Sequence, residues 1–153
     1  MLKKLLFLDI DGVLNTSGKY FNKDLNAGCL HQLERVLRAT GADVVISSQW
    51  RCHKYMMEFL KPLIESMGSK IAGSTKQIDL YKRIEEIENF LERVEPPFVF
   101  AVIDDEYKYF YGEVEEPVQS NYGLHKQLVI VADRTKGLTQ AEVDKLIEIL
   151  NQV

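Results

Sequence analysis

The hydrophobic positions of the chain fall into short apolar runs that are separated by longer amphipathic segments. Each run is only a few residues long and has polar neighbours, which is typical of strands buried on both faces of a parallel sheet. A weaker apolar stretch within residues 68–77 predicts one more, brief strand, so that a sheet of about five strands is expected. The main predicted strands cover residues 5–8, 42–48, 98–103 and 127–132.

The amphipathic segments predict the helices. Pro62 is expected to bend or break the second of them, because a proline nitrogen carries no proton and its ring clashes with the preceding turn. Strands that alternate with helices are typical of α/β proteins, so the sequence predicts a three-layer, doubly wound, Rossmann-like fold with a mostly parallel sheet. The predicted helices run from a cap at Asp24 or Asn26 to about Arg38, from Trp50 to about Met67, from Leu80 to Val94, and onward from a capping box at Thr139 and Glu142.

Composition and charge are typical of a globular chain without a strong electrostatic partner. The 153 residues are 46% hydrophobic and 27% charged, with no repeat, linker or low-complexity segment, which predicts one domain over residues 1–153. The net charge of -4 gives no general attraction to nucleic acid or to an anionic membrane, although it does not exclude a local basic patch. Cys29 and Cys52 form no CxxC pair, and no apolar run reaches transmembrane or signal-peptide length. We therefore expect a cytoplasmic protein with free thiols and no membrane partner.

Two carboxylates follow the first predicted strand. Asp9 and Asp11 are two positions apart, so their side chains point the same way while the backbone is extended, and Gly12 then allows a sharp turn. Two like charges this close favour a cation between them, and a site made only of oxygen ligands suits Mg2+. The alternative interpretation is an ordinary acidic turn after a strand.

Side chains capable of chemistry follow three of the predicted strands. The carboxyl ends of parallel strands lie along one edge of the sheet, where open α/β proteins bind their ligands. One shared site therefore explains these side chains better than three unrelated turns. They are Asp9 and Asp11 after the first strand, Ser47 and Ser48 after the second, and Asp104 and Asp105 after a later one.

These motifs resemble those of the haloacid-dehalogenase-like (HAD) phosphohydrolase superfamily. That family has DxDx(V/T) after its first strand, Ser or Thr after the second, a Lys or Arg, and an acidic pair after a later strand. More narrowly, the order DIDGVLN, ISSQWR, RIEEI, VIDDE and a late Gly137-Leu138-Thr139 resembles a small branch that includes the phosphatase-like domain of Swiss-army-knife RNA repair proteins. The resemblance spans nearly the whole chain.

The resemblance implies a phosphatase mechanism. Asp9 would be the nucleophile that forms an aspartyl phosphate, and Asp11 the general acid and then the general base, roles that suit the chemistry of carboxylates. Mg2+ would be held by Asp9, by the backbone carbonyl of Asp11, by Asp104, and by Asp105 directly or through water.

The same resemblance implies a phosphate-binding site. The Ser47 hydroxyl would donate a hydrogen bond to a phosphoryl oxygen, and the Ser48 amide a second one. The Lys or Arg of the family motif has more than one candidate in this sequence. Lys82 and Arg83 lie in the first predicted turn of their helix, where a positive charge opposes the helix dipole, which favours a functional role for Arg83. Lys76, just upstream, is the other candidate.

The chain offers no room for a cap domain, so a capless enzyme with an open site is expected. Such a site admits a phosphorylated substrate that is a nucleic-acid end, another macromolecule or a small phosphoester. The resemblance to RNA repair proteins favours a nucleic-acid end, whereas the net charge argues against strong nonspecific binding to nucleic acid; the oligomeric state stays open. The alternative to an enzyme is a non-catalytic or phospho-accepting signalling module on the same fold. Trp50 is expected in the core, Arg51 could reach an anionic substrate, and the Tyr107–Tyr111 cluster more simply covers the sheet than stacks on a base.

Overall fold

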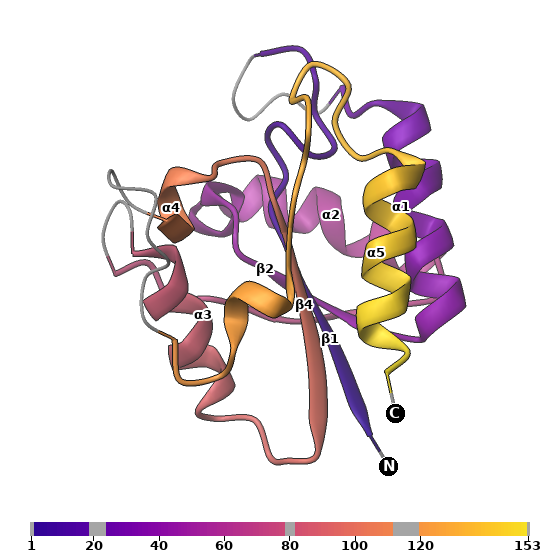
Figure 1. The fold of residues 1–153 in the computed structure, drawn as a ribbon. Coiled ribbons are helices and arrows are strands. Elements are labelled where there is room, and N and C mark those ends of the chain that lie inside the picture. The colour runs from indigo at the N-terminus through magenta and orange to yellow at the C-terminus, as the bar shows by residue number, and fades with distance from the viewer. Residues whose placement is uncertain (1, 19–23, 79–81, 112–119, 153) are drawn as a thin grey trace.

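A parallel sheet organises the part of the chain that the computed structural model describes, which comprises residues 2–18, 24–78, 82–111 and 120–152 (Figure 1). The sheet has five strands in the order β3-β2-β1-β4-β5, and every neighbouring pair is parallel. The predicted α/β fold with a parallel sheet of about five strands is therefore confirmed. The strands are β1 (Lys3–Leu8), β2 (Asp43–Ile46), β3 (Ile71–Ser74), β4 (Phe98–Asp104) and β5 (Leu128–Ile130).

The central position of β1 follows from its composition. Leu6 and Leu8 pack into the hydrophobic cluster on one face of the sheet, and Leu5 and Phe7 pack into the cluster on the other. A strand that is apolar on both sides is most stable between two neighbours and under two layers of helices. In the register of the sheet, Leu8 lies beside the ends of both β2 and β4, so the residues that follow these three strands reach the same edge.

Helices cover both faces of the sheet and give the three predicted layers. Apolar side chains of α1 (Ala27–Thr40), α2 (Lys54–Ser66) and α5 (Gln140–Leu150) fill one cluster, whereas α3 (Arg83–Leu91) and the short α4 (Lys108–Tyr111) contribute to the other. Figure 1 shows α1 and α5 packed side by side, with α3 and α4 across the sheet from them. None of the helices in the described residues combines the length and apolar character needed to cross a bilayer. Two short 3-10 turns complete the fold, η1 (Gln49–Cys52) and η2 (Leu124–Lys126).

The helix ends follow local signals in the sequence. The Asn26 side chain accepts a hydrogen bond of 3.0 Å from the Cys29 N–H at the start of α1, and Gly41 ends this helix with a left-handed φ of 71°. Thr139 and Glu142 form the predicted capping box of α5. These side chains satisfy backbone groups that a helix end otherwise leaves to solvent.

Two helices differ from their predicted extents. α3 begins at Arg83, whereas its sequence pattern began at Leu80, which lies outside the described residues. α2 begins at Lys54 and not at Trp50, because Trp50 lies in η1. The helix continues through Pro62, so it is not broken there, which was one of the two outcomes expected of this residue. Pro62 and Glu58 are both exposed, and water can therefore bind the Glu58 carbonyl that loses its helical partner.

The order of the strands places a switch point at the centre of the sheet. From β1 the chain moves outward to β2 and β3, and then returns to the other side of β1 for β4 and β5. Open α/β sheets bind their ligands outside the carboxyl ends of the strands at such a point. Among the described residues, only α1 separates β1 from β2 and only η1 and α2 separate β2 from β3, so no cap domain is evident there.

Candidate active site

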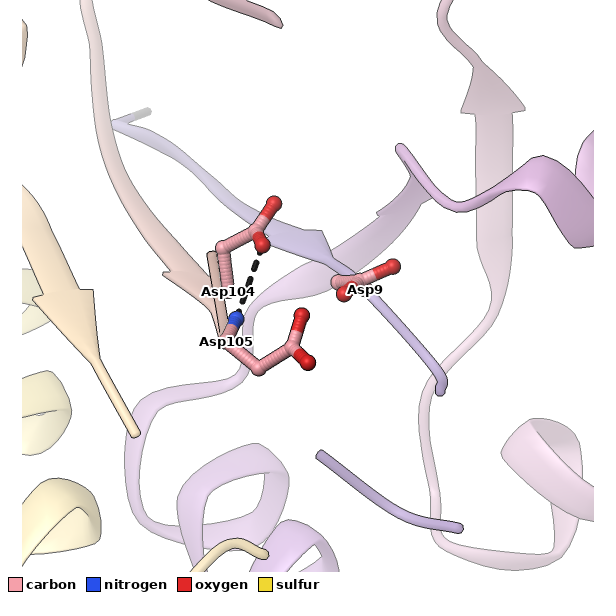
Figure 2. A group of neighbouring side chains, drawn as sticks. All are labelled: Asp9, Asp104 and Asp105. Atoms are coloured by element: carbon pink, nitrogen blue, oxygen red, sulfur yellow. Dashed lines mark hydrogen bonds between the residues drawn. The ribbon is translucent and has the colours of Figure 1, made fainter. Parts of the chain in front are cut away.

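Three carboxylates meet where β1 and β4 end. Asp9 follows β1, and Asp104 and Asp105 stand at the end of β4, as Figure 2 shows. Leu8 pairs with Ile103 in the register, and the Asp9 amide donates a hydrogen bond of 3.1 Å to the Ile103 carbonyl, so the two strand ends are level. One carboxylate oxygen from each of the three aspartates lies within 4.8 Å of the other two. Acids that are far apart in the sequence thus converge at one edge of the sheet.

Burial makes this cluster electrostatically unfavourable. Desolvation of the Asp9 carboxyl, together with repulsion from Asp104, raises its pKa well above the ordinary value despite the attraction of Arg83. Desolvation also raises the pKa of Asp104 to about 6, although Arg83 favours its charged form. Asp104 Oδ1 accepts the N–H groups of Asp105 and Glu106 at 2.7 and 3.0 Å, whereas its Oδ2 is buried and has no hydrogen-bond partner in the described part of the chain.

The residues of this cluster fit a hard divalent cation. All of the donors are carboxylate oxygens, the ligand type that Mg2+ prefers. A cation would offset the repulsion that raises the pKa values, and Asp104 Oδ2, which accepts no hydrogen bond within the described residues, is an oxygen that such an ion would satisfy. The Asp11 carboxylate is not a member of this cluster, because other side chains hold it elsewhere.

Asp11 lies in the tight turn after β1. Its Oδ2 accepts a hydrogen bond of 3.1 Å from the indole Nε1 of the fully buried Trp50, and Asn15 Nδ2 approaches its Oδ1 at 3.4 Å. Gly12 has a φ of 83° and lies against the Asp105 side chain, where a Cβ atom would collide with that carboxylate. Gly12 is therefore required both by the turn and by the close approach of the two acidic segments.

The hydroxyl residues after β2 lie beside this turn. The Ser47 amide donates to the Leu8 carbonyl at 3.0 Å, which places Ser47 next to Asp9, and its Oγ is buried without a hydrogen-bond partner among the described residues. Ser48 Oγ accepts from the Trp50 N–H at 3.2 Å and so caps η1. A cavity of about 70 Å³, which we call the aspartate cavity, is lined by Asp9, Asp11, Ser48, Gln49, Arg83, Asp105, Glu106, Tyr109 and Arg134.

Arg83 supplies a buried positive charge beside Asp9 and Asp104. Its Nη1 lies 3.9 Å from a carboxylate oxygen of Asp9 and 3.6 Å from one of Asp104, and it donates a hydrogen bond to the Ser47 carbonyl. Its guanidinium also lies over the Tyr109 ring, 4.9 Å from the ring centre. As the first residue of α3, Arg83 points back toward the end of β1.

The two lysines considered with Arg83 lie elsewhere. Lys76 is exposed and does not belong to the described lining of the aspartate cavity. Lys82 pairs with Glu85 on the surface of α3 at 3.5 Å. Of the three basic residues, the structure thus brings only Arg83 to the aspartates.

Comparison with known proteins agrees with this geometry. The family model for the HAD domain in Swiss Army Knife RNA repair proteins matches residues 5–143. The chain belongs to this family. No curated protein and no solved structure matches it. Membership in a HAD family indicates a phosphohydrolase-type function, and the acidic cluster of this HAD domain could hold a metal ion.

A buried ion-pair network links Arg83 to the end of β2 in this HAD domain. Arg51 Nη2 lies 3.0 Å from Glu86 Oε2, both side chains are only 3% exposed, and Glu86 Oε1 lies 3.9 Å from Arg83 Nε. Arg51 Nη1 donates to the carbonyls of Ser47 and Ser48 at 2.8 and 2.9 Å. Arg51 therefore braces the end of β2, and this burial favours a structural role over the substrate contact that the sequence suggested.

Sequence reasoning missed the roles of several other residues. Trp50 is in the core as expected, but its bond to Asp11 was not anticipated. Glu86 follows Arg83 by three positions, and this helical spacing is the one signal that could have linked them. Tyr109 lines the aspartate cavity, whereas Tyr107 and Tyr111 stack on each other with ring centres 4.2 Å apart.

Proposed function

We propose that this HAD domain is a Mg2+-dependent phosphomonoesterase that acts through an aspartyl phosphate on Asp9. The observation that carries the proposal is the convergence of Asp9, Asp104 and Asp105 beside the guanidinium of Arg83. A nucleophilic carboxylate, a set of oxygen ligands and a fixed cation are the groups that phosphoryl transfer requires.

The two carboxylates of the DxD motif divide the chemistry. An Asp9 oxygen attacks phosphorus, the bond from phosphorus to the leaving oxygen breaks, and Asp11 gives its proton to that oxygen. Asp11 then takes a proton from a water molecule that attacks the aspartyl phosphate, which releases inorganic phosphate and restores Asp9. The hydrogen bond from Trp50 orients Asp11 for both proton transfers.

The remaining residues neutralise charge. Asp9, Asp104, Asp105 and the main-chain carbonyl of Asp11 would hold Mg2+, which offsets repulsion between the anionic nucleophile and the phosphoryl group. Arg83 binds the phosphoryl oxygens, together with groups from the end of β2.

Ser47 and Ser48 are the phosphate-binding groups from the end of β2. Ser48 lines the aspartate cavity, and its amide donates to a phosphoryl oxygen. Ser47 is not part of the described lining, but it lies next to Asp9, and its hydroxyl, buried without a hydrogen-bond partner among the described residues, adds a second donor. Lys76 has no part in this proposal because it is exposed away from the cavity lining. The substrate is a phosphomonoester on a small molecule, a macromolecule or a nucleic-acid end.

The test is hydrolysis of p-nitrophenyl phosphate by the wild-type chain and by Asp9→Asn. Asp144→Asn is the matched control, because this aspartate lies on α5 with its side chain 60% exposed. Turnover that requires Mg2+, disappears in Asp9→Asn and persists in Asp144→Asn supports the proposal. Turnover that survives in Asp9→Asn, or no turnover at all, overturns it. A phosphoprotein that accumulates on Asp9 without turnover identifies a phospho-accepting signalling module instead.

A further inference from the structure

A second cavity adjoins the aspartate cavity. It has a volume of about 160 Å³, and we call it the Arg134 cavity. The two cavities share Asp11, Asp105 and Arg134, so they lie side by side at the carboxyl edge of the sheet. Asp9 lines only the aspartate cavity. The lining of the Arg134 cavity is Asp11, Gly12, Asn15, Thr16, Gly18, Asp105, Arg134 and Thr135.

The position of Asp11 identifies what the Arg134 cavity would receive. In the proposed reaction phosphorus lies against Asp9, and the leaving oxygen must lie within reach of the proton on Asp11. The neighbouring cavity that Asp11 lines and Asp9 does not is the Arg134 cavity. The alcohol that leaves with this oxygen therefore occupies the Arg134 cavity.

The size of the Arg134 cavity limits the part of the leaving group that it can enclose. A cavity of about 150 Å³ holds one benzene ring. The 160 Å³ here thus accommodates a short polyol chain or a single sugar ring next to the ester oxygen. Anything larger must extend into solvent.

Arg134 brings a positive charge to this cavity, whose lining also carries the carboxylates of Asp11 and Asp105. It is the one cationic side chain among the described residues that line the cavity, and its side chain is 54% exposed. Its Nη2 lies 3.2 Å from Glu106 Oε2, and its Nε lies 3.6 Å from Asp105 Oδ2. A guanidinium carries five N–H donors in a fork that matches the oxygens of carboxylate and phosphate.

We propose that Arg134 determines substrate specificity by binding a second anionic group, phosphate or carboxylate, on the leaving group. This inference rests on the proposed phosphatase function and narrows its substrate class to phosphomonoesters that carry another anionic oxygen group. Asp105 and Glu106 pair with the Arg134 guanidinium, which belongs to the lining of both cavities. They also compete with the substrate, which makes the expected preference moderate, about tenfold.

The test compares matched substrates within each variant. Propane-1,3-diol bisphosphate is compared with propane-1,3-diol monophosphate, and 3-phosphoglycerate with glycerol 3-phosphate, so the two pairs separate phosphate from carboxylate recognition. The variants are Arg134→Gln, Arg134→Lys and the control Arg93→Gln, whose arginine is exposed after the end of α3. Because Arg134 also contacts Asp105, any general effect of its loss acts on both members of a pair and cancels in their ratio of kcat/KM.

We expect the wild-type chain to favour the anionic leaving group by about tenfold in at least one pair, chiefly through KM. The ratio should fall to near one in Arg134→Gln, keep an intermediate value in Arg134→Lys and stay unchanged in Arg93→Gln. Turnover with no such preference, or a preference that survives in Arg134→Gln, overturns this inference alone. Absence of any turnover that depends on Asp9 overturns the proposed function and this inference with it.

Discussion

Replacing Trp50 with phenylalanine removes one hydrogen bond from Asp11 and keeps an aromatic ring in the core. The indole Nε1 donates to Asp11 Oδ2 at 3.1 Å, and Trp50 is fully buried, so solvent cannot readily substitute for this donor. Without it the Asp11 carboxyl loses one of the contacts that orient it for protonating the leaving oxygen. The variant thus tests whether the positioning of Asp11 contributes to catalysis.

The size of the effect follows from the type of bond that is lost. A hydrogen bond to a charged group contributes about 1.5–3 kcal/mol, which corresponds to about 10–100-fold in rate if it acts fully in the transition state. The loss should depend on the leaving group. An alkoxide needs the proton from Asp11, whereas p-nitrophenolate leaves without it. We therefore expect kcat/KM in Trp50→Phe to fall by about 10–100-fold for an alkyl phosphate and much less for p-nitrophenyl phosphate.

The assay measures kcat/KM for both substrates, because this ratio reports events up to the departure of the leaving group. Phe59→Leu is the control, because the ring centres of Phe59 and Trp50 are 6.4 Å apart. Loss of the Phe59 ring therefore loosens the packing around Trp50 without removing the hydrogen bond to Asp11. That control should change the two substrates equally. The reasoning is refuted if Trp50→Phe lowers both substrates by the same factor, or lowers neither while remaining folded.

Two further predictions concern stability. Glu86→Gln leaves the buried Arg51 and Arg83 without their shared carboxylate, so urea unfolding should show a loss of about 3–5 kcal/mol. The exposed Glu85→Gln should change stability by less than about 0.5 kcal/mol, and equal stability of the two variants would refute the network. In the metal-free protein the raised pKa of Asp104 means that the folded state holds its proton more tightly than the unfolded state. That stabilisation is fully present below pH 3.8 and is lost as the pH rises through about 6, amounting to about 3 kcal/mol. Mg2+ should therefore raise the melting temperature more at about pH 7.5 than at about pH 5, and an equal rise at both would contradict the assignment.

Much of the fold could be predicted because its signals are local. The apolar run of β1 and the two carboxylates after it occupy a few consecutive residues, and Asn26 and Gly41 mark the ends of α1 by their own conformational preferences. The geometry of a parallel sheet then places the ends of β1, β2 and β4 at one edge. A short motif and a general rule of sheet architecture were therefore enough to expect that Asp9 and Asp104 would lie close together.

The remaining features depend on packing between segments that are distant in sequence. Glu85 and Glu86 look alike in the sequence, yet the first has 56% of its side chain exposed and the second 3%. The bond from Trp50 to Asp11 joins residues 39 positions apart. Arg134 reaches the site only because the segment after β5 returns beside Asp105. Apart from the three-residue spacing between Arg83 and Glu86, no propensity or spacing rule carries this information.

The balance of charge at the centre of the site connects its stability with its function. Asp9, Asp104 and Asp105 bring three carboxylates together, and Arg83 is the one guanidinium within 4 Å of the first two in the described chain. When all of these groups are ionised, the three carboxylates outnumber this guanidinium by two. Arg134, whose Nε lies 3.6 Å from Asp105 Oδ2, offsets part of this excess, and a divalent cation would neutralise the rest. The raised pKa values of Asp9 and Asp104 have the same cause, because taking up a proton also removes negative charge from the cluster. An arrangement of this kind lowers the stability of the protein by itself and becomes favourable once a cation and a phosphoryl group enter, as expected of a site whose geometry serves catalysis.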